Sequence, residues 1–298
     1  MKLVIPTYNR AETINTINLE VFKQYETYLL FHSEEQKLKY IYANDLTGLN
    51  LVVGVESSTD GTAKARNIEW FIDNYIEDGE WFIFADDNIS SVAGLVDENM
   101  WQQEFINEVD KDWFGFYSPE LFNTRILELI DKAEDVNAHM IGFQTSKNYF
   151  YAHRKYRYRG YVIGKLYLWK KDKNFVWDKP FVPMEDFHIS IMHLLNYGCV
   201  LLCDYMWANA KHYTAGGLGS KSHRRDNYAY GTEYLSKKYP DLVKPKKRDD
   251  NYPDLRFTTF SDKNFYKWLK VYEAFKREYK FNEKTMRWDK KWYVLNTN

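Results

Sequence analysis

The stretch Trp81-Phe82-Ile83-Phe84-Ala85-Asp86-Asp87-Asn88-Ile89 decides how the rest of the chain is interpreted. Its first four residues predict a short buried strand, which runs directly into two carboxylates and an amide. Carboxylate oxygens suit hard cations such as Mg²⁺ and Mn²⁺, and ligands of open α/β sheets bind beyond the carboxyl ends of strands. We therefore expect Asp86, Asp87 and Asn88 to hold a metal ion against a phosphate group. The pattern alone is equally compatible with an acidic turn, because Asp and Asn favour turns.

The composition fits one large domain or two small ones. The chain has 298 residues, of which 45% are hydrophobic and 18% aromatic. The many rings suit stacking or sugar-facing surfaces, and equally a core built from aromatic side chains. Cys199 and Cys203 lie in an apolar run, so we expect them to pack as small hydrophobes in a reducing cytoplasm. The sequence shows no signal peptide and no apolar run of about 18 residues, so no membrane partner is expected.

Charge is divided unevenly along the chain. The net charge is −1, but residues 1–140 carry 10 Lys and Arg against 26 Asp and Glu, whereas residues 141–298 carry 31 against 16. A strongly basic half favours a polyanionic partner. The alternative is that the two halves neutralise each other inside one fold.

The first part of the chain alternates expected strands with expected helices. Strands are expected at 2–5, 51–55 and 81–84, with helices from Ala11 to Leu29 and from 65 to 75 between them. This order favours parallel strands joined by right-handed crossovers. The polar residues that follow the three strands should then meet at one edge of the sheet, where a nucleotide could bind. The sequence contains neither G-x-G-x-x-G nor G-x-x-x-x-G-K.

The rest of the chain continues the alternation and ends in basic segments. Residues 89–118 are expected to form an irregular segment over the site. Further helices are expected at 119–136, 183–198, 227–239 and 263–279, and further strands at 139–143, 166–169 and 200–202. The run 149–161 interleaves bases with aromatics, which suits either a phosphodiester backbone or an exposed strand. The glycine-rich run 211–221 could bring backbone amides to an anion.

Five segments of the chain carry motifs whose order is informative. They are Ile5-Pro6-Thr7-Tyr8-Asn9-Arg10, residues 56–67, residues 84–88, Met184-Glu185-Asp186 and His212. Together they resemble the nucleotide-sugar glycosyltransferases with a GT-A fold, in particular the large family 2, over residues 3–220. Glu56 stands where that family usually has Asp, and Asn88 replaces the third acid of its D-x-D element.

The resemblance implies an α/β fold of the GT-A, Rossmann-like type, with a mixed, mainly parallel sheet flanked by helices and a basic helical C-terminal extension. Residues 1–220 would form the catalytic domain, and residues 221–298 would pack on it as the extension, unless the whole chain is one domain. The donor would be a nucleoside diphosphate sugar, in the first instance a UDP-sugar, with Mn²⁺ or Mg²⁺ bridging its diphosphate.

The resemblance also assigns roles to residues. Metal ligands would be Asp86, Asn88 and His212, with Asp87 next. Asp186 and Glu185 would be the catalytic residues. Asp186 would be the base that deprotonates the acceptor hydroxyl, with a pKa raised by burial or by Glu185 beside it. The residues around the donor would be Pro6, Thr7, Asn9, Arg10, Glu56, Asn67, Asp86 and Asp87.

The C-terminal part narrows the resemblance. Segment 212–219, the pair Arg224-Arg225, segment 234–240 and the expected strand at 256–257 look like phage enzymes that glycosylate hydroxymethylpyrimidines in DNA, the TET-associated glycosyltransferase group. The implied function is metal-dependent sugar transfer to the hydroxymethyl group of a pyrimidine in phage DNA, in the host cytoplasm. The target base would be flipped out or reached through the major groove. The candidate phosphate contacts are Arg154, Arg157, Arg159, Lys221, Arg224, Arg225, Lys246, Lys247 and Arg248.

Two other interpretations stay open. One is a soluble GT-A glycosyltransferase that acts on a polysaccharide or another glycan. The other is a non-enzymatic nucleic-acid-binding protein with vestigial GT-A-like parts. The sugar, the choice of pyrimidine, the stereochemical outcome and the oligomeric state also stay open.

Overall fold

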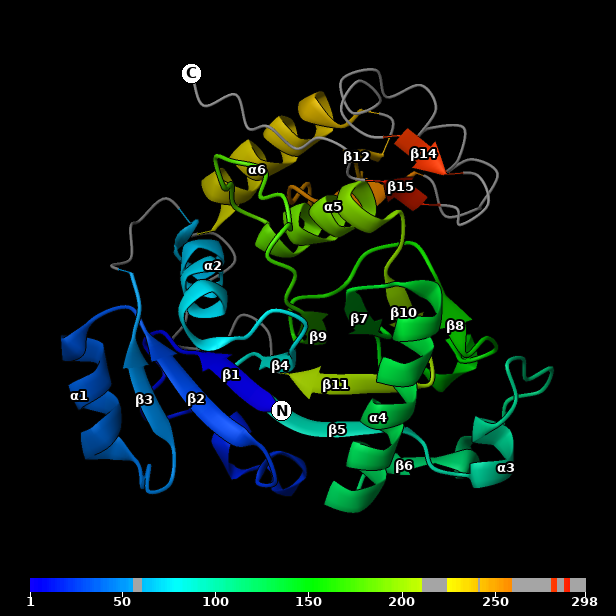
Figure 1. The fold of residues 1–298 in the computed structure, drawn as a ribbon, viewed down its shortest axis with the longest axis horizontal. Helices are drawn as coiled ribbons and strands as arrows, with labels where there is room; N and C mark the ends of the chain where they lie inside the picture. The colour runs from blue at the N-terminus through cyan, green and yellow to red at the C-terminus, as the bar shows by residue number, and fades with distance from the viewer. Residues whose placement is uncertain (56–60, 211–223, 241, 259–279, 283–286, 290–298) are drawn as a thin grey trace.

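An eight-stranded mixed sheet flanked by helices forms the centre of the fold (Figure 1). The computed structural model describes residues 1–55, 61–210, 224–240, 242–258, 280–282 and 287–289. From one edge to the other the strands are β3 (Asn50–Val53), β2 (Glu26–Phe31), β1 (Lys2–Pro6), β4 (Trp81–Ala85), β9 (Leu166–Lys170), β7 (Met140–Phe143), β10 (Leu201–Cys203) and β8 (Tyr156–Arg157). All of them except β9 and β8 run in the same direction. The predicted fold class, a mixed and mainly parallel sheet between helices, is confirmed.

The remaining described elements surround this sheet. The helices are α1 (Glu34–Ala43), α2 (Ala63–Tyr75), α3 (Glu98–Trp101), α4 (Pro119–Val136), α5 (Glu185–Tyr197) and α6 (Arg225–Lys238), with single 3₁₀ turns η1 (Thr16–Asn18), η2 (Glu20–Phe22), η3 (Lys111–Trp113) and η4 (Tyr149–Tyr151). Three smaller sheets contain β11 (Met206–Ala210), β5 (Ile89–Leu95) and β6 (Phe114–Phe116), then β12 (Val243–Pro245) and β13 (Leu255–Phe257), and finally β14 (Lys280–Asn282) and β15 (Arg287–Asp289).

Strand β4 is the centre of two hydrophobic cores, one on each face of the sheet. All five of its residues are buried, and successive side chains point to opposite faces because the strand repeat is two residues. Trp81, Ile83 and Ala85 belong to the core that contains α4, whereas Phe82 and Phe84 belong to the core of α2, α5 and α6. Complete burial of one such side chain stabilises the fold by about 1.5–3 kcal/mol, so this apolar run is confined to the middle of the sheet.

The helix expected from Ala11 to Leu29 is wrong. The chain forms η1 and η2 there and then enters strand β2, which pairs with β1 and β3 on either side. Residues 27–31 of β2 are all buried, and a strand buried on both faces reads as a continuous apolar run rather than an alternating one. The helix of this region is α1, which begins after Ser33, whose hydroxyl accepts the Gln36 N–H.

The irregular segment expected at 89–118 is also wrong, because it contains β5, α3 and β6. Strand β5 lies between β11 and β6 in a small antiparallel sheet in front of the main one (Figure 1). The expected helix at 119–136 is confirmed as α4, with Pro119 in its first turn. The strand expected at 200–202 is displaced by one residue, and the helix expected at 263–279 lies outside the described residues.

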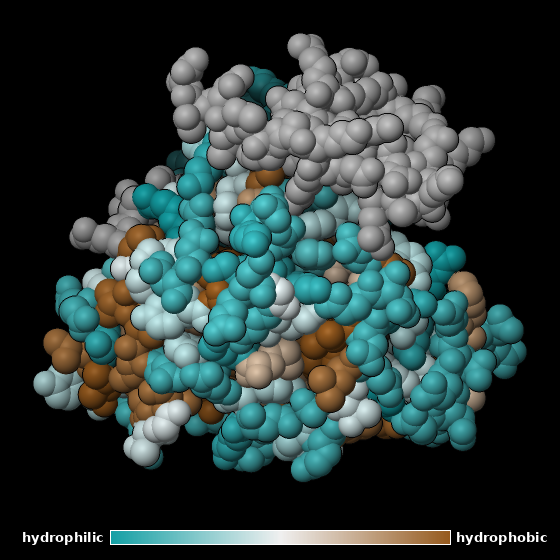
Figure 2. All heavy atoms as spheres, in the orientation of Figure 1, coloured by the Kyte–Doolittle hydropathy of each residue, from teal (hydrophilic) through white to brown (hydrophobic). Residues whose placement is uncertain are grey.

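One face of the molecule is mainly hydrophilic (Figure 2), and both cysteines lie in the interior. Figure 2 shows a face that is mostly hydrophilic, with hydrophobic side chains exposed in separate places. Cys199 and Cys203 are both free and buried, as expected. No helix in the described part of the chain is long and apolar enough to span a membrane.

Helix α6, the last helix of the described residues, is joined to α5 by a partly buried polar network around Asp178. The carboxylate of Asp178 accepts hydrogen bonds from His188 of α5 at 2.8 Å, from Lys238 of α6 at 2.5 Å, and from the Tyr239 hydroxyl. Gly231 of α6 meanwhile lies against the turn before α5, where a Cβ would come within 2.3 Å of the Pro183 carbonyl oxygen. Residues after 220 therefore contact the start of α5 directly.

Replacing Asp178 by Asn should destabilise the protein by about 2 kcal/mol at pH 7, because charge-assisted hydrogen bonds would be lost. Burial by itself raises the pKa of Asp178, but the bonds from His188, Lys238 and Tyr239 outweigh it and lower the pKa to about 2. The wild type should keep this stabilisation above pH 4 and lose it as the pH falls toward 2.

Chemical denaturation of both proteins at pH 7 and at pH 3 measures this difference. Asp249→Asn, at an exposed position nearby in the sequence, is the control and should unfold like the wild type. Equal unfolding free energies of Asp178→Asn and the wild type at pH 7 would contradict the prediction.

Candidate active site

The candidate site lies at the carboxyl edge of β1 and β4, as expected from the order of the strands. These two strands are parallel neighbours, so the residues that follow them emerge on the same side. Strand β9 pairs with β4 in the opposite direction, and Leu166 lies opposite Ala85. The loop before β9 therefore reaches the same edge, where the Asp86 N–H donates to the Lys165 carbonyl at 2.7 Å.

Asp86 shares a cation with Glu185. The Lys64 ammonium, from the first turn of α2, lies 2.9 Å from Asp86 Oδ1 and 2.9 Å from Glu185 Oε1. Its third contact is the Gly164 carbonyl oxygen at 3.3 Å. Burial by itself lowers the pKa of Lys64, but Asp86 and Glu185 raise it well above its ordinary value. Burial correspondingly raises the pKa of Glu185, and Lys64 brings it below its ordinary value.

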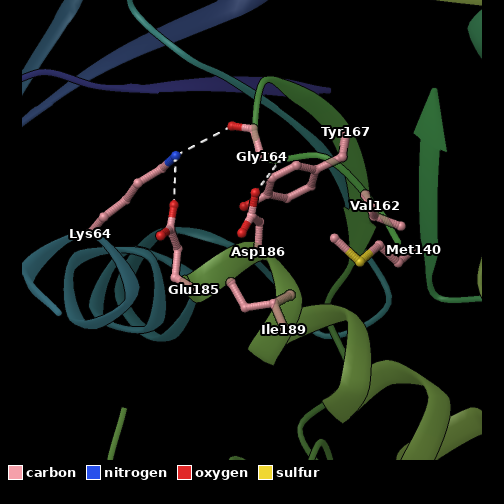
Figure 3. A pocket seen from close by; sticks show the side chains of 8 residues that line it. All are labelled: Lys64, Met140, Val162, Gly164, Tyr167, Glu185, Asp186 and Ile189. Atoms are coloured by element: carbon pink, nitrogen blue, oxygen red, sulfur yellow. Dashed lines mark hydrogen bonds and ion pairs between the residues drawn. The ribbon is translucent and has the colours of Figure 1, made fainter. Parts of the chain in front are cut away.

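Asp186, in the first turn of α5, lines a small pocket together with Lys64 and Glu185 (Figure 3). Its Oδ2 accepts hydrogen bonds from the Tyr161 hydroxyl and, at 3.3 Å, from the Gly164 N–H. Burial first, and the adjacent Glu185 carboxylate second, raise the pKa of Asp186 to about 6. A carboxylate with such a pKa is ionised at neutral pH and still basic enough to take a proton.

The turn before α5 explains why both acids point into the pocket. Met184 is buried and has a left-handed backbone with φ of 71°, a conformation that costs a non-glycine residue free energy. The helix starts directly after it, with Glu185 and Asp186 in its first turn. Carboxylates there are stabilised by the helix dipole, which by itself would explain their presence without a catalytic role.

Asp87 is bound to Arg10 and is not directed at Lys64. The Arg10 guanidinium donates to Asp87 Oδ1, and both side chains are nearly buried. Burial raises the pKa of Asp87 to about 6, although Arg10 beside it has the opposite effect. The Arg10 N–H donates to the Tyr40 hydroxyl at 2.8 Å, so the loop after β1 is tied both to β4 and to α1.

The other predicted donor-site residues are placed less uniformly. Pro6 ends β1, and Thr7 is buried after it, with its N–H bonded to the Leu30 carbonyl. The Asn9 side chain accepts a hydrogen bond from Gln36 at 2.7 Å. Asn67 is buried in α2, and its amide donates to the Val55 and Ala63 carbonyls. The amide nitrogen therefore binds the backbone of the protein itself.

The predicted metal ligands are only partly described. Asp86 lies at the site, and Asn88 is buried next to it. Glu56, His212 and Lys221 lie outside the described residues. Among the residues that the structure does describe, no group of three or more His, Cys, Asp or Glu side chains could hold a metal ion.

The basic residues of run 149–161 differ in how accessible they are. Arg154 is exposed, with its guanidinium 5.2 Å from the centre of the Phe105 ring. Arg157 forms two hydrogen bonds with Asp204, of 2.5 and 2.6 Å. Arg159 is buried, with 7% of its surface exposed. Of these three, only Arg154 lies as a phosphate contact would require.

The later basic residues are more exposed. Arg224 is half-buried at the start of α6, and Arg225 is exposed. Lys246, Lys247 and Arg248 are all exposed in the turn after β12, where Asp250 and Asp254 pair with two of them. The three basic side chains are accessible, although Asp249, Asp250 and Asp254 balance their charge.

Two polar residues that contact the candidate acids, Lys64 and Tyr161, had no predicted role. Lys64 carries a signal that could have identified it, because a cation in the first turn of a helix opposes the helix dipole. Tyr161 stands at the end of the aromatic run 149–161, and nothing in the sequence pattern singles it out.

Comparisons with known proteins add a distant similarity of fold. No family model matches the sequence, and no curated protein matches it. The structure is similar to the crystal structure of S. aureus TarS 1-349 in complex with UDP-GlcNAc, with 13% sequence identity and a TM-score of 0.42. The similarity covers 76% of this chain and 63% of that chain, so this chain spans less than two thirds of the TarS structure.

Proposed function

We propose that the protein is a glycosyltransferase that uses a nucleoside diphosphate sugar, in the first instance a UDP-sugar. The observation that carries this proposal is the meeting of Asp86, at the carboxyl end of β4, with Glu185 and Asp186 at the start of α5. Asp86 and Asp186 are 100 residues apart in the sequence, and Lys64 connects Asp86 to the small pocket that Glu185 and Asp186 line. This pocket is the place where a donor and an acceptor would meet.

In the proposed reaction, Asp186 accepts the proton of the acceptor hydroxyl. The hydroxyl oxygen then forms a bond to the anomeric carbon of the sugar, and the bond from that carbon to the diphosphate breaks, so the nucleoside diphosphate leaves. The Tyr161 hydroxyl and the Gly164 N–H hold Asp186 Oδ2, which fixes the carboxylate toward the pocket. This role applies to transfer with inversion of configuration.

We propose that the site binds the predicted Mn²⁺ or Mg²⁺, because such an ion needs only one or two carboxylates when a diphosphate supplies further oxygens. The Lys64 ammonium shows that oxygens of Asp86, Glu185 and Gly164 converge on a single positive charge. We propose Asp86 and Asn88 as ligands, together with His212. A bound divalent cation would neutralise the charge that develops on the leaving diphosphate.

For the acceptor, we propose the hydroxymethyl group of a modified pyrimidine in DNA. The exposed cations at 246–248, together with Arg154 and Arg225, support binding to phosphates. Lysine and arginine side chains in such positions bind a DNA backbone without regard to sequence. The hydroxymethylated base would provide the selectivity.

A glycan acceptor is the second candidate, and exposed aromatic rings favour it. Phe114 of β6 stacks on Tyr149 at 5.7 Å, while Phe116 and Phe150 beside them are 74% and 60% exposed. Exposed rings on neighbouring elements suit stacking against flat ligands. The limited accessibility of Arg157 and Arg159 also weakens the DNA proposal.

The proposed acceptor is tested by incubating the protein with a panel of nucleotide sugars, Mn²⁺ and hydroxymethylated duplex DNA. Mass spectrometry of the nucleosides should then reveal a glycosylated hydroxymethylpyrimidine. Replacing Lys246, Lys247 and Arg248 together by Gln should weaken DNA binding and reduce the slope of log affinity against log salt by about two to three.

The matched control replaces Lys23, Lys37 and Lys39 by Gln, which removes the same charge from the acidic half and should leave the salt slope unchanged. Turnover of a nucleotide sugar without any labelled nucleoside would refute the DNA acceptor and direct attention to glycans. A salt-independent DNA affinity would refute the role of the basic half.

A further inference from the structure

The cation at the centre of the site belongs to the protein itself. Lys64 contacts three oxygens that come from three different parts of the chain, at the end of β4, the start of α5 and the loop before β9. No motif assigned a role to this residue. Its position on α2 therefore requires a physical explanation.

Local helix energetics do not favour a lysine at this position. Lys64 is the second residue of α2, where the helix dipole disfavours positive charge by about 0.3–1 kcal/mol. The contacts with Asp86 and Glu185 provide the compensation, since two acids at one site repel each other unless a cation lies between them. The ammonium also lies 5.0 Å from the centre of the Phe84 ring, a contact that attracts a cation.

The oxygens around Lys64 are also those that a divalent cation would prefer. Mg²⁺ and Mn²⁺ bind carboxylate and carbonyl oxygens at about 2.0–2.2 Å, closer than an ammonium can approach. The Asp86 oxygen that faces Lys64 cannot serve both cations at once. The lysine side chain is long and unbranched, and a quarter of its surface is exposed, so it can turn away from Asp86 without unfolding α2.

We propose that Lys64 is a tethered counter-ion, which neutralises Asp86 and Glu185 in the absence of metal and gives up Asp86 when a divalent cation binds that carboxylate. This inference rests on the proposed function, because it concerns the same metal site. The inference adds that competition with the Lys64 side chain sets the affinity of the protein for the metal. The protein would keep its acids neutralised between reaction cycles and take up the metal only where the cation displaces Lys64.

The test measures Mn²⁺ binding by electron paramagnetic resonance, with and without UDP, and does not depend on activity. Lys64→Met keeps the unbranched stem over Phe84, one atom shorter than lysine, and removes the competing charge. It should bind Mn²⁺ about tenfold more tightly than the wild type, which corresponds to about 1.4 kcal/mol. Lys64→Gln serves for the same comparison if the Met variant does not fold.

Lys165→Met is the matched control for the general loss of positive charge. Burial lowers the pKa of Lys165 and Asp86 acts against this effect, and none of the contacts described for Asp86 involves the Lys165 side chain. If Lys64→Met and Lys165→Met bind Mn²⁺ equally well, the exchange is refuted and the effect is general electrostatics.

Asp86→Asn should lose Mn²⁺ binding. If it binds Mn²⁺ as the wild type does, or if neither the wild type nor any variant binds Mn²⁺, the metal site and the exchange are both refuted. If Lys64→Met binds Mn²⁺ more tightly and the wild type transfers no sugar, the exchange is supported and the proposed function is refuted.

Discussion

Replacing Asp186 by Asn is expected to lower sugar transfer by about 10²–10⁴-fold, the usual loss when a general base is removed. An amide keeps the shape of the side chain and can still accept the Tyr161 hydrogen bond, but it cannot take the acceptor proton. Initial rates of transfer at saturating donor measure this loss. Since the position of the pocket residues should not change, donor affinity should stay close to that of the wild type.

The same variant should be more stable than the wild type at pH 7. The pKa of Asp186 is raised from 3.8 to about 6, so the folded protein favours the protonated side chain. The corresponding stabilisation is complete below pH 4 and is lost as the pH rises through 6. Asn never ionises, so Asp186→Asn should melt at a higher temperature at pH 7, with little difference near pH 4.

The activity of the wild type gives an independent measure of this group. Transfer should fall as the pH drops below about 6, because the base becomes protonated. Asp131→Asn, on the exposed side of α4, is the control and should change neither rate nor stability. Full activity of Asp186→Asn would eliminate the residue as the base, and a lower melting temperature at pH 7 would contradict its raised pKa.

Replacing Asp86 by Ala is expected to lower kcat/KM by about 10²–10³-fold, comparable to the removal of an electrostatic contact with a developing negative charge. The variant lacks one of the two carboxylates that surround Lys64 and the first proposed metal ligand. Donor binding should weaken together with the rate. Calorimetric titration with UDP in Mn²⁺ and initial rates of transfer measure the two effects.

The response of DNA binding to Asp86→Ala separates an enzyme from a binding protein. A nucleic-acid-binding protein with vestigial GT-A-like parts would keep its full function in this variant. We expect DNA affinity to be unchanged while transfer is lost. Asp112→Ala, at an exposed site on η3, should leave both properties intact, and an unchanged transfer rate of Asp86→Ala would refute the proposed role.

The sequence predicted those elements of the fold whose apolar pattern has a single explanation. Strand β4 and helix α4 were placed correctly, because a short run of rings and a long periodic segment after Pro119 leave little choice. Strand β2 was missed because its residues 27–31 are buried on both faces, so the run lacks the alternation of an ordinary strand. Pairing with β1 and β3, which no local pattern records, decides its conformation.

The sequence predicted the positions of those candidate site residues that belong to a recognisable motif. The order of the strands brought Asp86 to the sheet edge, and Glu185 and Asp186 begin α5 as expected. Lys64 and Tyr161 were missed because their role arises only where α2, α5 and the loop before β9 meet. The antiparallel direction of β9 brings that loop to the site, and the sequence does not state strand direction.

The close contact of Gly231 with Pro183 limits how this protein could be assembled or divided. A chain that ended near residue 220 would contain all five segments that resemble GT-A enzymes, yet it would lack helix α6, which contacts the turn before α5. Asp186 would therefore reach its final position only after α6 has been synthesised. For the same reason, a graft that replaced α6 would remove the Gly231 contact with Pro183 and disturb the turn before Asp186.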